Sequence, residues 1–165
     1  MNGRLGMSLV HKVMALESPN RVLPPLMPSI DRSFHRITRG RSLFFTLPDP
    51  KSGLILTTTG AQSGQPRRTP LLCITEEPDR WLVIGSNFGK PSHPGWTANL
   101  RQQPHAMINW RGRDIPVLAT HLSQHERDAR WPAIVAFWPP YEACRRRTDR
   151  EIRVFRLTRR QITGQ

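Results

Sequence analysis

The stretch between residues 54 and 96 constrains the fold of this chain more than any other feature. Its three runs of β-branched and aromatic residues, which favour β-strands, are residues 54–59, 69–75 and 81–85. Gly60, Gly64 and Gly89 lie in the polar segments that follow these runs. Because glycine adopts positive φ readily, the backbone N–H groups of such turns can converge on an anion. The stretch therefore predicts strands whose turns hold a phosphorylated ligand.

Further strand-like runs raise the expected number of strands to six or seven. They are residues 41–47, 106–110, 114–121 and 151–157. Residues 76–80 and the Arg111-Gly112 pair are typical of hairpin turns between such runs. With no internal repeat and only a few helical segments, this pattern predicts a mainly β fold, a small barrel with helical decoration.

The helical segments are marked by their end signals. Pro94 suits the first turn of a helix, where its missing N–H costs nothing, and Pro104 ends that helix. Ser123 and Glu126 have the spacing of a capping box, which predicts a helix start. We expect Pro132 to open a separate helical segment. Its apolar side chains would be Ile134, Val135 and Trp138.

The length of 165 residues favours one domain with two flanking segments. Residues 1–30 are expected to form an N-terminal arm and linker, 31–160 the barrel, and 161–165 a C-terminal tail. Apolar residues recur in the arm at near-helical spacing, so an amphipathic helix that contacts a membrane surface is one interpretation. The alternative interpretation is an arm that frays or packs on the barrel. The recurring apolar residues of the arm are Leu5, Leu9, Val13 and Leu16.

The charge of the chain predicts an acidic partner. Lys and Arg number 25 against 12 Asp and Glu, a formal net charge of +13. A nucleic acid, an anionic membrane surface or a polyanionic cofactor would each satisfy this charge. Aromatic residues make up only 7% and do not alternate with basic ones, which disfavours a nucleic-acid stacking platform.

Several other classes of protein are disfavoured by missing signals. No run approaches the ~20 apolar residues of a membrane-spanning helix. Cys73 and Cys144 do not form a C-x-x-C pair, and unpaired cysteines fit a reducing cytoplasm. The six histidines lack metal-ligand spacing, so no metal site is expected. The hydrolase, zinc-protease, P-loop and Rossmann motifs are absent as well.

Three motifs resemble those of the deazaflavin-dependent nitroreductase family. They are TTTGAQSGQPRRTPL (residues 57–71), SNFGKPSHPGWTANLRQQP (86–104) and WPPYEACRRRTDREI (138–152). The resemblance spans residues 31–158 and implies a split β-barrel related to FMN-binding oxidoreductases. It also implies reduced coenzyme F-420 as cofactor, whose phosphate and oligoglutamate tail make it a polyanion. Barrels of this type often dimerise, so a homodimer is expected.

Arg67 is the leading candidate for cofactor binding. A guanidinium at a turn presents a planar fork to phosphate oxygens, and the resemblance places the cofactor's phosphate-bearing tail at this residue. Arg68 would alternate to the opposite face, and Gln62 stands where relatives usually carry Lys or Arg. A solvated turn is the alternative interpretation. The full cofactor-binding set is Gly60, Gln62, Gln65, Pro66, Arg67, Arg68, Ser86, Asn87, Phe88, Gly89, Lys90 and Trp96.

The third motif is expected to line the acceptor side. Relatives often show tyrosines spaced three apart here, whereas this chain has its single tyrosine, Tyr141, flanked by Trp138 and Cys144. A hydroxyl near a hydride acceptor can donate a proton or orient the acceptor. We therefore interpret Tyr141 and Ser86 as catalytic candidates. Packing of Tyr141 at a helix start is equally compatible with the sequence.

Together these observations predict a cytoplasmic oxidoreductase that passes a hydride from reduced coenzyme F-420 to an organic acceptor. A nitroaromatic compound, a quinone or another unsaturated molecule would serve as acceptor. One alternative is an FMN-binding protein of the same fold. The other is a basic module that binds nucleic acid or a membrane surface.

Overall fold

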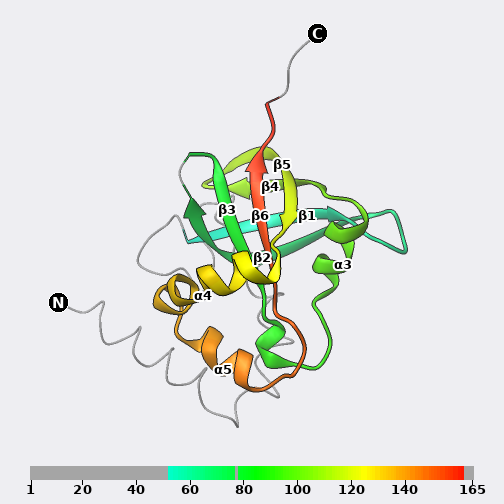
Figure 1. Cartoon of the computed structure of the whole chain (residues 1–165). Coiled ribbons are helices and arrows are strands. Elements are labelled where there is room, and N and C mark those ends of the chain that lie inside the picture. Colours follow the sequence, from blue (N-terminus) through cyan, green and yellow to red (C-terminus); the bar gives the residue numbers. More distant parts are fainter. Residues whose placement is uncertain (1–51, 77, 162–165) are drawn as a thin grey trace, which may run out of the picture.

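A closed barrel of six strands forms the body of the protein in a computed structural model that describes residues 52–76 and 78–161 (Figure 1). All neighbouring strands pair antiparallel, in the order β1-β2-β3-β6-β5-β4. The strands are β1 (Gly53–Thr59), β2 (Pro66–Glu76), β3 (Arg80–Gly85), β4 (His105–Trp110), β5 (Arg113–His121) and β6 (Arg153–Arg159). The predicted mainly β barrel with helical decoration is confirmed.

In the described residues, three helices and one short 3₁₀ turn accompany the barrel. In Figure 1, α4 and α5 lie together on one side, whereas α3 lies beside β1. Among the described residues, none of these helices has the length and apolar character needed to cross a bilayer. The helical elements are η2 (Asn87–Gly89), α3 (Gly95–Gln102), α4 (Gln124–Phe137) and α5 (Pro140–Arg146).

The strand boundaries differ from the predicted ones where pairing extends a strand. β2 begins at Pro66, three residues before the predicted start, because the ladder with β1 continues to the Thr59–Pro66 pair. A proline is tolerated as the first residue of a strand, where no ladder N–H is needed. β6 starts at Arg153, two residues later than predicted. The predicted strand at 41–47, the N-terminal arm at 1–30 and most of the tail at 161–165 lie outside the described residues.

The alternation of side chains along the strands produces two apolar clusters. Residues on one face of β3 and β6, such as Trp81 and Phe155, point into the barrel with Leu56 of β1. Residues on the other face, such as Leu82 and Val154, pack with α4 and α5. Because both faces of β3 are covered, its WLVIG run is buried throughout. This wall of the barrel carries the loop that leaves β3.

The predicted capping box is confirmed at the start of α4. The Ser123 hydroxyl accepts a hydrogen bond from the Glu126 N–H, and the Glu126 carboxylate accepts one from the Ser123 N–H. The expectation that Pro132 opens a separate segment is wrong, because Pro132 lies inside α4. Its neighbours Trp131 and Ile134 are buried in the cluster on β3 and β6, and this packing outweighs the loss of one helical hydrogen bond. The next helix, α5, begins only at Pro140.

Candidate cofactor-binding site

The turn between β1 and β2, residues 60–65, is the first part of the candidate site. The Gly60 N–H donates to the Gln65 carbonyl at 2.8 Å, and the Gly64 N–H donates to the Gly60 carbonyl at 2.8 Å. Gly64 has a φ of 66°, and a Cβ on Gly60 would lie 2.5 Å from the Ser63 hydroxyl. Gly64 therefore supplies a backbone angle that other residues rarely adopt, and a side chain at position 60 would crowd the Gln65 carbonyl oxygen at 3.1 Å.

Arg67 follows this turn with its side chain exposed. Its Nη2 donates to the Ser63 hydroxyl at 3.3 Å, which keeps the guanidinium beside the turn. In the described ranges, neither Arg67 nor Arg68 takes part in an ion pair. Gln62 and Gln65 are exposed in the same turn, and Pro66 starts the strand. The sequence prediction thus gathers these residues correctly around one turn, although their contact with a cofactor stays a prediction.

Asn99 of α3 fixes the position of this turn, and sequence reasoning assigned it no role. Its Oδ1 accepts a hydrogen bond from the Ala61 N–H at 2.9 Å. Its Nδ2 donates to the Thr58 hydroxyl, also at 2.9 Å. One side chain therefore joins the helix to the strand end and to the turn. The contact spans about forty residues of sequence, for which no local signal exists.

The second part of the site is the loop of residues 86–90, which leaves β3. Asn87, Phe88 and Gly89 all have positive φ, of 46°, 55° and 75°. The Gly89 N–H donates to the Ser86 carbonyl and the Lys90 N–H to the Asn87 carbonyl, each at 3.0 Å. Three consecutive residues in this region are uncommon, especially for a bulky side chain such as phenylalanine.

Helix α5 lies against this loop. A Cβ on Gly89 would lie 2.8 Å from the Cys144 carbonyl oxygen and 2.8 Å from Cβ of Arg147. Burial raises the pKa of the Cys144 thiol, and the charge of Arg147 and a hydrogen bond with Ser86 only partly oppose it. The structure therefore brings Ser86 and Gly89 of the predicted cofactor set together with Cys144 of the predicted acceptor set.

Tyr141 lies in the same helix and is buried. Burial raises the pKa of its phenol well above the ordinary value, and the nearby Cys144 and Cys73 thiols act in the same direction. Its hydroxyl therefore keeps its proton at neutral pH and remains a hydrogen-bond donor. Both cysteines are buried, and neither forms a disulfide bond.

Two predicted aromatic site residues are placed in apolar clusters. Trp96 is 5% exposed in the barrel core, where its ring meets Phe155 edge-on with centroids 5.7 Å apart. Trp138 is 4% exposed and packs with Tyr141 in the cluster beneath α4 and α5. Contact of these side chains with a cofactor or an acceptor stays a prediction.

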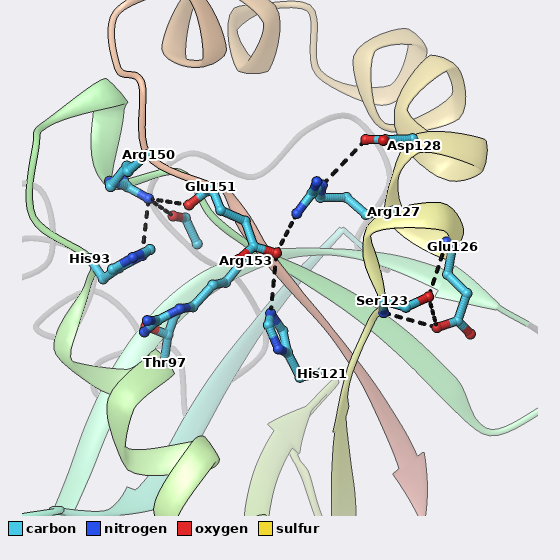
Figure 2. Close-up of polar contacts among 11 residues, drawn as sticks. His93, Thr97, His121, Ser123, Glu126, Arg127, Asp128, Arg150, Glu151 and Arg153 are labelled. Carbon is cyan, nitrogen blue, oxygen red and sulfur yellow. Dashed lines mark hydrogen bonds and ion pairs between the residues drawn. The ribbon is translucent and has the colours of Figure 1, made fainter.

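Arg150 is the functional candidate that sequence reasoning missed. Its guanidinium donates to the carbonyl oxygens of Ser86 at 2.6 Å and Lys90 at 2.8 Å, the two ends of the 86–90 loop. Figure 2 shows its side chain between His93 and Glu151. The sequence shows only one more arginine in a basic stretch, because its partners lie about sixty residues away.

The described residues contain no group of three or more His, Cys, Asp and Glu side chains able to hold a metal ion. Arg67 offers an exposed guanidinium beside the turn, whereas the N–H groups of Gly60, Ala61, Gly64 and Gln65 donate hydrogen bonds within the protein.

Comparisons with known proteins agree with this architecture. A sequence model of the family described as F420H(2)-dependent quinone reductase matches residues 32–159. An F420H(2)-dependent quinone reductase of Mycobacterium tuberculosis (strain ATCC 25618 / H37Rv) is 36% identical over 131 residues, 78% of this chain and 87% of that protein. The corresponding protein of Mycobacterium bovis, named as a putative enzyme of this kind, has the same identity and coverage.

Two solved structures are similar to the chain as well. One, described as an F420-H2 dependent reductase (FDR-A), has a TM-score of 0.58 and 32% identity, and the match covers 65% of this chain and 94% of that one. The other, described as a domain-swapped dimer, has a TM-score of 0.60 and 30% identity, with 76% and 94% covered.

The described residues form a mainly β protein, a closed antiparallel barrel of six strands with a few helices. The family match covers most of the sequence, and the chain belongs to the F420H(2)-dependent quinone reductase family. The expected resemblance to deazaflavin-dependent enzymes is thereby confirmed, as are oxidoreductase activity and coenzyme F-420 as the cofactor. FMN remains the alternative cofactor.

Proposed function

We propose that this protein uses reduced coenzyme F-420 to reduce a quinone. The names of the family and of the mycobacterial relatives favour this acceptor over a nitroaromatic compound or another unsaturated molecule. When bound, reduced F-420 supplies the hydride, and the protein contributes position, electrostatics and exclusion of water.

The β1–β2 turn and Arg67 carry this proposal. A phosphate needs several donors and a positive charge, and the exposed guanidinium of Arg67 offers both beside the turn. No described carboxylate lies within 4 Å of that guanidinium to neutralise it. The donor set therefore fits the phosphate-bearing, polyanionic part of the cofactor, while Gln62 would contribute a neutral contact.

The 86–90 loop and helix α5 would hold the deazaflavin ring of the cofactor and the acceptor that it reduces. Ser86 and Cys144 meet where the loop packs on α5, and Tyr141 lies one helical turn before Cys144. Because the phenol of Tyr141 stays protonated, it would donate a hydrogen bond to an acceptor oxygen and stabilise negative charge that develops there. The surrounding apolar cluster would keep water away from the acceptor.

A titration of the purified protein with three ligands tests the proposal. Coenzyme F-420, FMN and duplex DNA would be added separately, and binding followed by cofactor absorbance and native mass. We expect stoichiometric binding of F-420 and faster oxidation of its reduced form by a quinone than by a nitroaromatic compound. Preference for FMN or DNA would replace the proposal by the corresponding alternative.

We also propose a cytoplasmic homodimer. The solved structure described as a domain-swapped dimer supports the assembly, and two cysteines that form no disulfide bond fit a reducing compartment. Light scattering during size-exclusion chromatography would measure the mass against the 19.0 kDa of one chain. A monomer at micromolar concentration would contradict the assembly.

Peripheral contact with the cytoplasmic membrane face through residues 1–30 completes the proposal. Its support is the spacing of apolar residues in the sequence of the arm. Deletion of residues 1–29 should reduce cosedimentation with anionic vesicles and leave F-420 binding intact. Equal cosedimentation of both forms would remove the membrane role, and loss of F-420 binding would place the arm in the pocket.

A further inference from the structure

The guanidinium of Arg150 gathers the backbone at both ends of one loop. Nη2 donates to the Ser86 carbonyl at 2.6 Å, Nε to the Lys90 carbonyl at 2.8 Å, and Nη1 to the Gly85 carbonyl at 3.3 Å. Every nitrogen of the fork therefore has a backbone acceptor in or next to the 86–90 loop. A planar group with donors in fixed directions sets the spacing of the carbonyl groups that it binds.

Two further contacts orient Arg150 itself. Nη1 lies 3.2 Å from Nδ1 of His93 and donates to the carbonyl oxygen of Glu151 at 3.1 Å, as Figure 2 shows. Arg150 forms no ion pair with any carboxylate in the part of the chain that the structure describes. Its donors are used on backbone carbonyl groups and on one imidazole, which gives the side chain a geometric role.

The loop needs such support because its conformation is unfavourable for its residues. Asn87 and Phe88 have φ of 46° and 55°, a region that residues with a Cβ rarely occupy. In the described part of the chain, the loop's own hydrogen bonds include those donated by the Gly89 and Lys90 N–H groups and one from the Asn87 side chain to the Ser92 carbonyl. Backbone held in sparsely populated regions persists only where the surroundings over-determine it, and such segments concentrate at ligand sites.

We propose that Arg150 is a positioning residue that holds the 86–90 loop in the conformation that receives the deazaflavin. The loop conformation is a property of the protein alone, whereas its use in cofactor binding rests on the proposed function. When only a fraction of molecules is competent to bind, the apparent affinity falls by that fraction. We call the hydrogen bonds from Arg150 to the carbonyl groups of Gly85, Ser86 and Lys90 the clamp. Its loss should therefore weaken cofactor binding although Arg150 touches no reacting atom.

Three variants separate geometry from charge. Arg150→Gln removes the fork, and Arg150→Lys keeps a positive charge but places its donors on one nitrogen, so it cannot reproduce the spacing of the fork. Arg153→Gln is the matched control, since Arg153 is also partly exposed and donates instead to the Thr97 hydroxyl at 3.2 Å. Arg150→Lys also provides a readable variant if Arg150→Gln does not fold.

Hydrogen exchange in the free protein tests the clamp without any cofactor. The Gly89 and Lys90 amides donate the loop's own hydrogen bonds, so their exchange reports its opening. We expect exchange about tenfold faster or more in Arg150→Gln, an intermediate rate in Arg150→Lys, and no change in Arg153→Gln. An exchange rate in Arg150→Gln equal to that of the wild type would overturn the proposal that Arg150 holds the loop. A wild-type exchange rate in Arg150→Lys would overturn it as well.

An F-420 titration then tests what the loop is for. Arg150→Gln should raise the Kd about ten- to a hundredfold, matching a competent fraction of about a tenth to a hundredth. The kcat at saturating cofactor should change much less, which distinguishes positioning from catalysis. Faster exchange with an unchanged Kd would overturn the positioning role. Failure of the wild type to bind F-420 would refute the proposed function. The hydrogen-exchange result would still show whether Arg150 holds the 86–90 loop.

Discussion

Gly89 lies so close to Cys144 that a Cβ on the glycine would be 2.8 Å from the cysteine's carbonyl oxygen. This contact joins the 86–90 loop to α5, and so joins the predicted cofactor side to the predicted acceptor side. Gly89 also has a φ of 75°, which disfavours any other residue. Two independent constraints therefore require glycine at this position.

Gly89→Ala should consequently lower the free energy of unfolding by about 2 kcal/mol or more, from backbone strain and overpacking together. It should also weaken F-420 binding, since the loop can no longer pack on α5. Gly95→Ala is the matched control, because no atom lies within 4 Å of its added Cβ at the start of α3. Urea denaturation of both variants makes the comparison. Equal stability of the two would mean that the loop shifts without cost.

Arg67→Ala should weaken F-420 binding by about 1.5–3 kcal/mol, the range for a hydrogen bond to a charged group. Added salt should shrink this difference, because an exposed guanidinium is screened. Arg68→Ala, on the adjacent and oppositely directed side chain, should have a smaller effect. Titrations at two salt concentrations measure both variants. An unchanged Kd for Arg67→Ala at low salt would remove this residue from the site.

The single tyrosine of the sequence allows its pKa to be measured directly. Burial raises the pKa of Tyr141, so its phenolate absorbance should remain absent in the folded protein at pH 10, where an exposed tyrosine is half ionised. At pH values between the pKa of Tyr141 in the unfolded chain and its higher pKa in the folded protein, ionisation of the phenol favours the unfolded chain. The free energy of unfolding should therefore fall as the pH rises above about 10, by up to 1.4 kcal/mol per pH unit. An absorbance midpoint near pH 10 before unfolding would show an accessible phenol.

Tyr141→Phe should lower turnover more than cofactor affinity. Removal of one donor to developing negative charge typically costs about 10²–10³ in kcat, while the ring and its packing remain. Turnover with a quinone and the Kd for F-420 would be measured on the same preparation. If bound reduced F-420 is oxidised at the wild-type rate in this variant, Tyr141 serves packing alone.

Local composition was sufficient to predict most of the barrel. The runs that became β1 and β3 are bounded by polar turns, and their residues suit strands in any context. The start of β2 at Pro66 was missed because it depends on a partner strand. Pro132 was misinterpreted for a similar reason, since burial of Trp131 and Ile134 keeps α4 continuous.

The turn and the loop that carry the candidate residues were predictable where those residues are contiguous in sequence. The β1–β2 turn and the 86–90 loop were identified by glycines and polar residues between strands. Asn99 and Arg150 were not, because each acts on backbone that is distant in sequence and becomes adjacent only when the barrel closes.

The rate at which a quinone oxidises reduced F-420, with and without saturating protein, tests the central claim most directly. The account predicts that the bound cofactor is oxidised much faster than the free one, and that Arg67→Ala needs more cofactor to reach the same rate. Equal rates for bound and free cofactor would contradict the proposed quinone reductase activity.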